Sequence, residues 1–186
     1  MSTLTYLMNV SLDGYVETPE RGLEWADVDD ELHAWFNERE RASEASLYGR
    51  RIYELMAAFW PTAHEDPAAT PVVREFARIW NAKPKIVFSS TLERVASNSR
   101  LVRGDPVAAL DGLRAEFPGG LDVAGPTLAA AFIARDLVDR YQLVVHPVIL
   151  GAGTPYLPPL DRRIDLRLVG RHDFASGAIA LEYERR

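Results

Sequence analysis

A segment near residue 125 has the composition of an anion-binding turn. Gly125-Pro126-Thr127-Leu128 follows a short apolar run and precedes a helical pattern. Free backbone N–H groups and the positive end of the helix dipole would therefore face an anion such as a pyrophosphate. The alternative interpretation is a plain strand-to-helix turn, with glycine for the tight geometry and proline to start the helix. Neither G-x-G-x-x-G nor G-x-x-x-x-G-K-[ST] occurs, so no dinucleotide fingerprint and no P-loop identifies a nucleotide site.

Two further segments carry side chains that bind anions. In Gly49-Arg50-Arg51, two guanidinium groups at a strand-to-helix junction can clamp a phosphate bidentately, which one lysine cannot do. A solvated helix start is the alternative, although arginines in the first turn of a helix oppose its dipole. Ser89-Ser90-Thr91 follows another short apolar run and offers three hydroxyls and backbone donors, with an ST-turn or an N-cap as its alternative. Together the segments predict phosphate sites at the ends of strands.

Other kinds of chemistry lack the residues that they need. The chain has no cysteine, which excludes disulfides and thiolate metal sites. Its histidines share no metal-ligand spacing, so we expect no structural or catalytic metal. No G-x-S-x-G elbow occurs and Ser11 has no identifiable base, so a serine hydrolase is not expected. The histidines are His33, His64, His146 and His172.

Alternating strands and helices are expected to position these segments. The run from Leu4 to Val10 is typical of a buried, central strand that ends at the turn Ser11-Leu12-Asp13-Gly14. Helices are expected to begin near Asp29 and Asp30, which give an acidic first turn, and at Thr70 and Asp105, which are good N-caps. The remaining expected elements are a helix from Ile52 to Phe59 that Pro61 closes, strands at 85–88, 121–124 and 141–150, a helix after Gly125, and an antiparallel hairpin around Ile164 to Leu168 and Ile179 to Tyr183.

This order of elements predicts an α/β fold with a three-layer sheet of mixed direction. In such sheets, ligands bind beyond the carboxyl ends of the strands. The loops that follow the expected strands are therefore the places where chemistry is expected.

Composition limits the class of protein further. The 186 residues are 47% hydrophobic and 26% charged, with a formal net charge of -6, which is ordinary for one globular domain spanning 1–186. The acidic balance argues against a nucleic-acid-binding surface. No apolar run approaches the ~20 residues of a membrane helix. We therefore expect a soluble, cytoplasmic protein with no nucleic-acid partner and no membrane partner.

Six segments are each common alone, but their occurrence in this order is specific for one family of proteins. They are Ser11-Leu12-Asp13-Gly14-Tyr15, Tyr48 to Glu54, Lys85 to Leu92, Val123 to Leu128, Asp136 to Asp139, and His146 to Gly153. In this order they resemble the dihydrofolate reductase fold, and most closely its bacterial branch related to the C-terminal reductase domain of the bifunctional riboflavin biosynthesis enzyme. The resemblance covers nearly the whole chain. It implies a three-layer α/β/α fold with a mixed, mostly parallel central sheet and a C-terminal antiparallel hairpin, and it implies a homodimer.

The resemblance also implies an oxidoreductase that takes a hydride from NADPH. The arginines after Gly49 and the hydroxyls at 89–91 would surround the adenosine phosphate, the turn at 125 would hold the pyrophosphate, and the first strand would flank the nicotinamide. Two departures from the family pattern are Pro126, which lacks an N–H donor, and Ile52, which replaces the usual threonine. The implied cofactor-binding residues are Met8, Asn9, Val10, Gly49, Arg50, Arg51, Ser89, Ser90, Thr91, Gly125, Pro126, Thr127 and Leu128.

The substrate implied by the resemblance is similar to 5-amino-6-(5-phosphoribosylamino)uracil, which is reduced at its ring-opened ribose. By the family's spacing, His33 stands near the place where true dihydrofolate reductases carry an acid, which argues against folate reduction. Asp13 and His33 are the candidate catalytic residues. Either His33 or Glu31 could replace the acid, and a structural role on the helix surface is the alternative for His33. The candidate substrate-binding residues are Ser11, Asp13, Tyr15, Tyr53, Trp60, Leu150, Gly151 and Gly153.

Three functions are open at this point. The leading hypothesis is an NADPH-dependent small-molecule reductase. A catalytically silent nucleotide-binding or regulatory module on the same fold is the alternative, favoured by Pro126, Ile52 and the missing helix carboxylate. A purely structural α/β domain would bind no dinucleotide.

Overall fold

A computed structural model describes residues 2–96 and 98–186, which divide into two compact units. The first unit contains Ser2 and the segment Asp29–Asp122. The second unit combines the segment Thr3–Val28 with Val123–Arg186. The first unit is therefore almost one unbroken stretch of chain, whereas the second is assembled from two segments that are distant in sequence.

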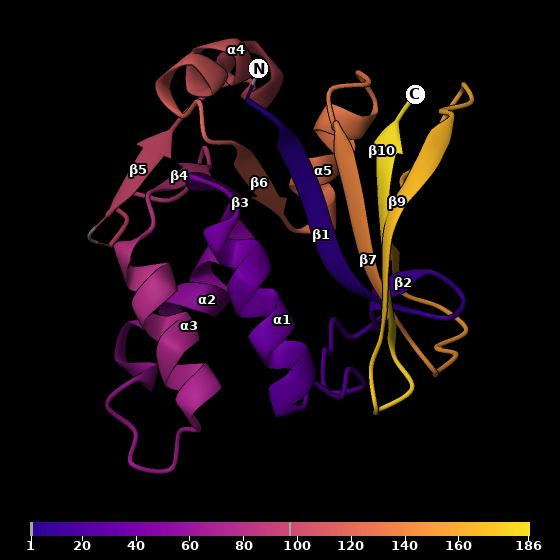
Figure 1. Cartoon of the computed structure of the whole chain (residues 1–186). Coiled ribbons are helices and arrows are strands. Elements are labelled where there is room, and N and C mark those ends of the chain that lie inside the picture. Colours follow the sequence, from indigo (N-terminus) through magenta and orange to yellow (C-terminus); the bar gives the residue numbers. More distant parts are fainter. Residues whose placement is uncertain (1, 97) are drawn as a thin grey trace. The chain divides into compact units, whose positions relative to one another are not determined.

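Ten strands lie in the described residues. They are β1 (Leu4–Ser11), β2 (Tyr15–Glu17), β3 (Ala45–Gly49), β4 (Lys85–Phe88), β5 (Ser99–Val102), β6 (Leu121–Ala124), β7 (Arg140–His146), β8 (Thr154–Pro155), β9 (Leu166–Asp173) and β10 (Ile179–Arg185). Eight of them are hydrogen-bonded in the order β5-β4-β3-β6-β1-β7-β10-β9 (Figure 1), and β2 pairs with β8. The pairs β3/β4, β4/β5 and β1/β7 are parallel, while β10 is antiparallel to β7 and to β9. The predicted mixed, mostly parallel sheet with a C-terminal antiparallel hairpin is confirmed.

Four helices belong to the first unit: α1 (Asp30–Arg41), α2 (Arg50–Ala63), α3 (Pro71–Ala82) and α4 (Pro106–Glu116). Helix α3 packs against both α1 and α2 (Figure 1). The predicted cap at Asp105 forms, since Asp105 accepts a hydrogen bond from the Val107 N–H at 2.9 Å. Asp29, predicted only to lie at a helix start, is also an N-cap and accepts a hydrogen bond from the Leu32 N–H at 2.8 Å. No helix in the described part of the chain is long and apolar enough to cross a membrane.

Two predictions about helix ends need correction. Pro61 does not close α2, which continues to the buried residue Ala63. Pro61 lies in the last turn, where only one backbone donor is lost, and its carbonyl accepts a hydrogen bond from Asn81 Nδ2 of α3 at 3.2 Å. Thr70 is the N-cap residue of α3, but its hydroxyl donates to Asp30 Oδ1 at 3.1 Å and caps no helix N–H.

The second unit contains the parallel pair β1/β7, the hairpin β9/β10 and helix α5 (Pro126–Ile133). In β1 and β7 the register runs from Thr5 opposite Arg140 to Ser11 opposite His146. The strand predicted at 141–150 is shorter, because Pro147 has no N–H and the Val148 N–H turns back to the His146 carbonyl at 2.8 Å. The chain after β7 is therefore a loop, which lies at the same strand ends as the turn that follows β1.

Two lysines are buried in the first unit. Lys83 Nζ donates hydrogen bonds to Asp122 Oδ1 at 2.6 Å, Glu40 Oε1 at 3.1 Å and Ser43 Oγ at 2.7 Å. The two carboxylates come from the start of β6 and the end of α1, so the lysine joins elements that are far apart in sequence.

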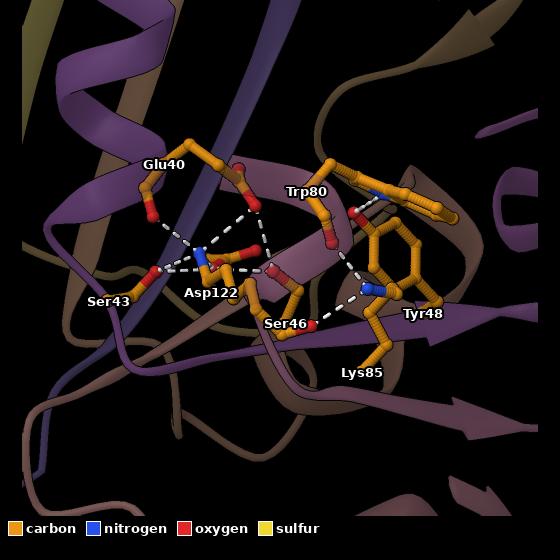
Figure 2. Close-up of polar contacts among 8 residues, drawn as sticks. Glu40, Ser43, Ser46, Tyr48, Trp80, Lys85 and Asp122 are labelled. Atoms are coloured by element: carbon orange, nitrogen blue, oxygen red, sulfur yellow. Dashed lines mark hydrogen bonds and ion pairs between the residues drawn. The ribbon is translucent and has the colours of Figure 1, made fainter. Parts of the chain in front are cut away.

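The second buried lysine lies on β4, close to the first. Lys85 Nζ donates to the carbonyl oxygens of Trp80 and Lys83, and it lies 4.2 Å from the centroid of the Trp80 ring (Figure 2). The Trp80 indole N–H in turn donates to the Tyr48 hydroxyl at 3.1 Å. Burial lowers the pKa of Lys85 to about 8. These contacts hold α3 and β4 together with β3.

Candidate functional site

The predicted phosphate segments of the first unit meet at the ends of two neighbouring strands. Gly49 and Phe88 are register partners in the parallel pair β3/β4, so the loops after these strands begin side by side. Arg50 Nη1 donates a hydrogen bond to Thr91 Oγ1 at 2.9 Å, while the Arg50 side chain is 54% exposed. Arg51 follows in the first turn of α2 and is half-buried. An exposed guanidinium beside a hydroxyl has the donors that bind a phosphate.

The loop after β4 is an ST-turn, which was the alternative raised by its sequence. Ser89 Oγ accepts hydrogen bonds from the N–H groups of Thr91 and Leu92 at 3.2 and 3.0 Å. Arg103 holds the same loop, donating to the Ser90 carbonyl at 2.8 Å and to the Leu92 carbonyl at 2.7 Å. We call the set at these strand ends the arginine–hydroxyl cluster, which consists of Arg50, Ser89, Ser90, Thr91 and Arg103.

The other predicted residues of the first unit lie in aromatic surroundings. The buried Tyr53 hydroxyl accepts a hydrogen bond from the Ala96 N–H at 2.6 Å, which anchors the loop before β5. His33 lies edge-on to Trp60 and Phe76, with ring centroids 5.9 and 5.5 Å away. The structure therefore brings His33 and Trp60 together. Within the described residues the buried Nδ1 of His33 has no hydrogen-bond partner.

In the second unit, Asp13 fastens two loops together. Its Oδ1 accepts hydrogen bonds from the Ser11 hydroxyl at 2.7 Å and the Leu150 N–H at 3.1 Å, and its Oδ2 accepts one from the Gly151 N–H at 2.7 Å. The Ser11 hydroxyl above all, and then the two backbone donors, hold the pKa of the Asp13 carboxyl below its usual range. Ser11 Oγ also accepts the Tyr15 N–H at 2.9 Å. Five predicted substrate residues thus come together around an ionised carboxylate, whose part in proton transfer stays a prediction.

Gly153 has a structural reason to be glycine. Its φ is +149°, and an added Cβ would overlap the carbonyl oxygen of Glu17. Glu17 pairs with Thr154 in the β2/β8 sheet, and the Thr154 hydroxyl donates to Glu17 Oε1 at 2.6 Å. The close approach of the two backbones accounts for the residue type, while substrate contact by Gly153 stays a prediction.

Met8, Asn9 and Val10, predicted to flank the nicotinamide, are consecutive residues of β1. Val10 is buried, whereas Met8 and Asn9 are half-buried. Asn9 Oδ1 lies 2.9 Å from His146 Nε2, at the end of the neighbouring strand β7. The ring of Trp25 lies edge-on to His146, with centroids 5.6 Å apart. The polar end of β1 therefore has partners that sequence analysis did not assign.

The predicted pyrophosphate turn keeps two backbone donors. Gly125 has a φ of +94°, in the left-handed region that favours glycine, and Pro126 begins α5. The Ala129 N–H donates to the Gly125 carbonyl at 3.1 Å. Because Pro126 has no N–H, the N–H groups of the first turn are those of Thr127 and Leu128, which lie too early in the helix for an acceptor within it. Two N–H groups at a helix start can still bind an anion.

A family model for the RibD C-terminal domain matches residues 2–180. The chain belongs to the RibD C-terminal domain family. One curated relative, uncharacterized protein YyaP of Bacillus subtilis (strain 168), is 28% identical over 177 residues, which cover 94% of this chain and 90% of YyaP. The predicted resemblance is thus confirmed at the level of the family.

Solved structures confirm the fold of this RibD C-terminal domain. A putative riboflavin biosynthesis protein from Shewanella sp. PV-4 superposes with a TM-score of 0.76 at 21% identity, covering 99% of both chains. Dihydrofolate reductase from Enterococcus faecalis, complexed with NADP(H), gives a TM-score of 0.64 at 15% identity and covers 99% of this chain and 96% of that one. At these identities the likeness shows a dihydrofolate reductase-like fold.

Two functional candidates of this RibD C-terminal domain were missed by sequence analysis. Arg103 directly follows β5, so it would have been a candidate if that strand had been predicted. His146 was part of a matching segment, and its place at the end of an apolar run was the signal that could have singled it out.

Replacing Asp13 with asparagine is expected to loosen the two loops that it joins. Asparagine has one acceptor oxygen and an NH2 group in place of the other, so one of the Leu150 and Gly151 N–H groups must lose its partner. Amide hydrogen exchange at these two positions should become faster. Glu20→Gln, which changes an exposed carboxylate of the same unit, serves as the control. An unchanged rate of amide exchange at Leu150 and Gly151 in the Asp13 variant would show that Asp13 does not hold the two loops together.

The same contacts give the protein a dependence on pH. Because the pKa of Asp13 is lowered in the folded state, its stabilising contribution is present above the ordinary carboxyl pKa. That contribution is lost as the pH falls through the lowered folded value. The acid limb of an unfolding curve should therefore be less steep for Asp13→Asn than for the wild type.

Proposed function

We propose that the protein is an NADPH-dependent oxidoreductase, which transfers a hydride from NADPH to a small heterocyclic or sugar-derived substrate. Membership of the RibD C-terminal domain family supports a reductase of this class. The observation that carries the cofactor assignment is the contact between Arg50 and Thr91, since it places a cation and a hydroxyl together at the strand ends. NADPH differs from NADH by the 2′-phosphate that such a pair would recognise.

Each unit has donors that suit a part of this cofactor. Arg50 and Thr91 would bind the 2′-phosphate, and the N–H groups of Thr127 and Leu128 would bind the pyrophosphate. The first strand, from Met8 to Val10, would flank the nicotinamide. A bound nicotinamide supplies the hydride. The chain therefore has to bind the cofactor and the substrate, orient them toward each other and exclude water. NADP(H) in the complex of the structurally similar E. faecalis enzyme supports the choice of cofactor.

The substrate would bind at the loops that Asp13 holds together. These loops, 11–15 and 147–153, follow the adjacent strands β1 and β7 and so lie where ligands bind in sheets of this kind. A substrate similar to 5-amino-6-(5-phosphoribosylamino)uracil is the class that the family favours. Asp13 would act there by fixing the loops, with Leu150 and Gly151 held by its two oxygens.

A thermal shift experiment with NADPH, NADH, FAD and FMN tests the cofactor. A ligand at ~100 times its Kd stabilises a protein by about 2.7 kcal/mol, which raises the melting temperature of a domain of this size by roughly 5–10 °C. We expect the largest shift with NADPH. A shift with a flavin alone, or with none of the four, would contradict the proposal.

Arg50→Ala is expected to weaken NADPH binding about 10- to 100-fold, because a charge-assisted hydrogen bond to the 2′-phosphate is lost. Binding of NADH should change little, since NADH has no such phosphate. Isothermal titration with both nucleotides measures the difference. Arg100→Ala is a matched control, because Arg100 is a similarly exposed arginine of the first unit that pairs with Glu116. Equal weakening of both nucleotides would rule out the assigned contact.

A catalytically silent nucleotide-binding or regulatory module is the second candidate. Pro126 favours it, because the first turn of α5 offers one donor fewer than a non-proline sequence would. Such a module would bind NADPH without oxidising it across a panel of carbonyl, imine and pterin substrates. Oxidation of NADPH with any of these compounds would exclude it.

A further inference from the structure

Asn9 is an unusual residue for its place in the sheet. Strands inside a mostly parallel sheet are normally apolar on both faces, and a polar side chain there must find hydrogen-bond partners. Asn9 lies near the end of β1, next to the buried residue Val10, and is itself half-buried. Its carboxamide can accept through the oxygen and donate through two N–H groups. Its hydrogen-bond partners therefore show what the side chain does.

His146 uses the oxygen. Asn9 is the register partner of Val144, and His146 is two residues further along β7, so the two side chains are on the same face of the sheet. His146 Nε2 lies 2.9 Å from Asn9 Oδ1. Burial lowers the pKa of His146, and only Asp27 acts in the opposite direction, so the ring is neutral near pH 7. With the proton on Nε2, the ring donates to Asn9 Oδ1 and fixes the orientation of the amide.

Two other donors near His146 donate to no residue that the structure describes. No hydrogen bond joins Asn9 Nδ2 to any residue within the described parts of the chain. Trp25 lies edge-on to His146, and its indole nitrogen is buried without a partner among the same residues. The Asn9 amide nitrogen is not fully buried, so a ligand can reach it, whereas the Trp25 indole nitrogen is a buried donor without an acceptor, which is rare in proteins and which a bound ligand could satisfy. An acceptor such as a carbonyl oxygen suits this set.

We infer that the Asn9 amide binds a carbonyl oxygen of the bound ligand, and that His146 is a positioning residue that keeps the N–H groups of Asn9 turned toward it. This inference rests on the proposed function. The carbonyl belongs either to the carboxamide of the nicotinamide or to the substrate. In both cases its oxygen accepts a hydrogen bond from the Asn9 amide. The place fits either source, because Asn9 belongs to the strand predicted to flank the nicotinamide, and Ser11 and Asp13 of the substrate loops lie two and four residues after it.

Binding of two nucleotides to four proteins tests the inference. The nucleotides are NADPH and ADP-ribose 2′-phosphate, which has the same phosphates but no nicotinamide. The proteins are the wild type, Asn9→Leu, His146→Leu and His146→Gln. If Asn9 binds the nicotinamide carboxamide, Asn9→Leu should raise the Kd of NADPH about 3- to 10-fold and leave that of ADP-ribose 2′-phosphate unchanged. Unchanged binding of the second nucleotide also shows that the variant is folded.

His146→Leu and His146→Gln separate positioning from packing. Leucine removes the hydrogen bond to Asn9, so the Kd of NADPH should rise as in Asn9→Leu. The amide nitrogen of glutamine can replace Nε2 as the donor, so His146→Gln should restore binding to within about 2-fold of the wild type. In the free wild-type protein, ¹⁵N NMR of the ring should show the Nε2–H tautomer, which Asn9→Leu should shift toward a mixture. A packing role alone would not move the tautomer.

The remaining outcomes are equally decisive. If Asn9→Leu binds both nucleotides normally but lowers kcat/KM about 3- to 10-fold with a substrate that the wild type reduces, the carbonyl belongs to the substrate. If binding and kcat/KM are both unchanged, the inference is overturned while the proposed function stands. Wild-type protein that binds neither nucleotide would overturn the proposed function and the inference together.

Discussion

Replacing Lys83 with methionine is expected to lower the free energy of unfolding by about 3–5 kcal/mol. The Lys83 side chain is only 5% exposed, and its ammonium contacts carboxylates that are 15% and 18% exposed, those of Glu40 and Asp122. Removing the cation leaves two acidic groups buried beside each other without compensation (Figure 2). Burial and the charge of Asp122 already raise the pKa of Glu40 in the wild type.

Urea unfolding at pH 7 measures this loss. The triple variant Lys83→Met, Glu40→Gln, Asp122→Asn should recover much of it, because no unpaired charge remains. Burial alone would lower the pKa of Lys83, but Asp122 and Glu40 raise it above its ordinary value. Its contribution is therefore fully present below that ordinary value and is lost as the pH rises through the raised one. A loss below about 1 kcal/mol for the single variant would show that the network carries little stability.

Gly153→Ala is expected to cost about 3–5 kcal/mol. The φ of +149° is a conformation that alanine rarely adopts, and the new Cβ would overlap the Glu17 carbonyl, which is backbone and cannot rotate away. The loop must therefore move, and the short β2/β8 sheet must open with it. Both effects add to the loss of stability.

Gly151→Ala is the matched control for Gly153→Ala. Gly151 is in the same loop and has a φ of +77°, but a Cβ there would meet no atom within 4 Å. Only the left-handed conformation is penalised, which costs about 1–2 kcal/mol. Urea unfolding of the two variants, with amide exchange at Glu17 as a local probe, compares them. Equal losses in the two variants would mean that the close approach to Glu17 does not exist in solution.

Local signals predicted most elements of the fold. From residue type and the pattern that follows, Asp105 was assigned as a helix cap and Asp29 to an acidic helix start, and both residues cap their helices. The strand β5 was missed because its four residues, Ser99–Val102, neither alternate nor form an apolar run. The strands β2 and β8 are three and two residues long, and their pairing depends on a contact between distant segments.

Buried lysines could not have been predicted. Lysine is normally solvated, and the partners of Lys83 are about 40 residues away on either side in the sequence. Nothing in the local pattern of Lys83 or Lys85 marks them as buried. Only the tertiary fold brings Glu40 and Asp122 to the same ammonium.

The candidate site was predictable where it depends on strand ends. The alternation of elements indicated a mixed sheet with ligands at its strand ends. Arg50 and Thr91 meet there because β3 and β4 are parallel neighbours, which only the structure shows. The pair of Asn9 and His146 was not found, because it depends on the register of two strands that are distant in sequence. The single domain over 1–186 and the homodimer stay predictions.

The two segments of the second unit are synthesised at different times, because the whole of the first unit's main segment lies between them in the sequence. Thr5 of β1 is opposite Arg140 of β7, so the pairing has a very high contact order. A ribosome adds about 5–20 residues per second, which leaves β1 without this partner for on the order of ten seconds. Through that interval the nascent chain carries an apolar strand with unpaired edges, while the continuous segment Asp29–Asp122 is being completed. Within this unit, β1 is therefore made first and remains without its partner β7 until the second segment is synthesised.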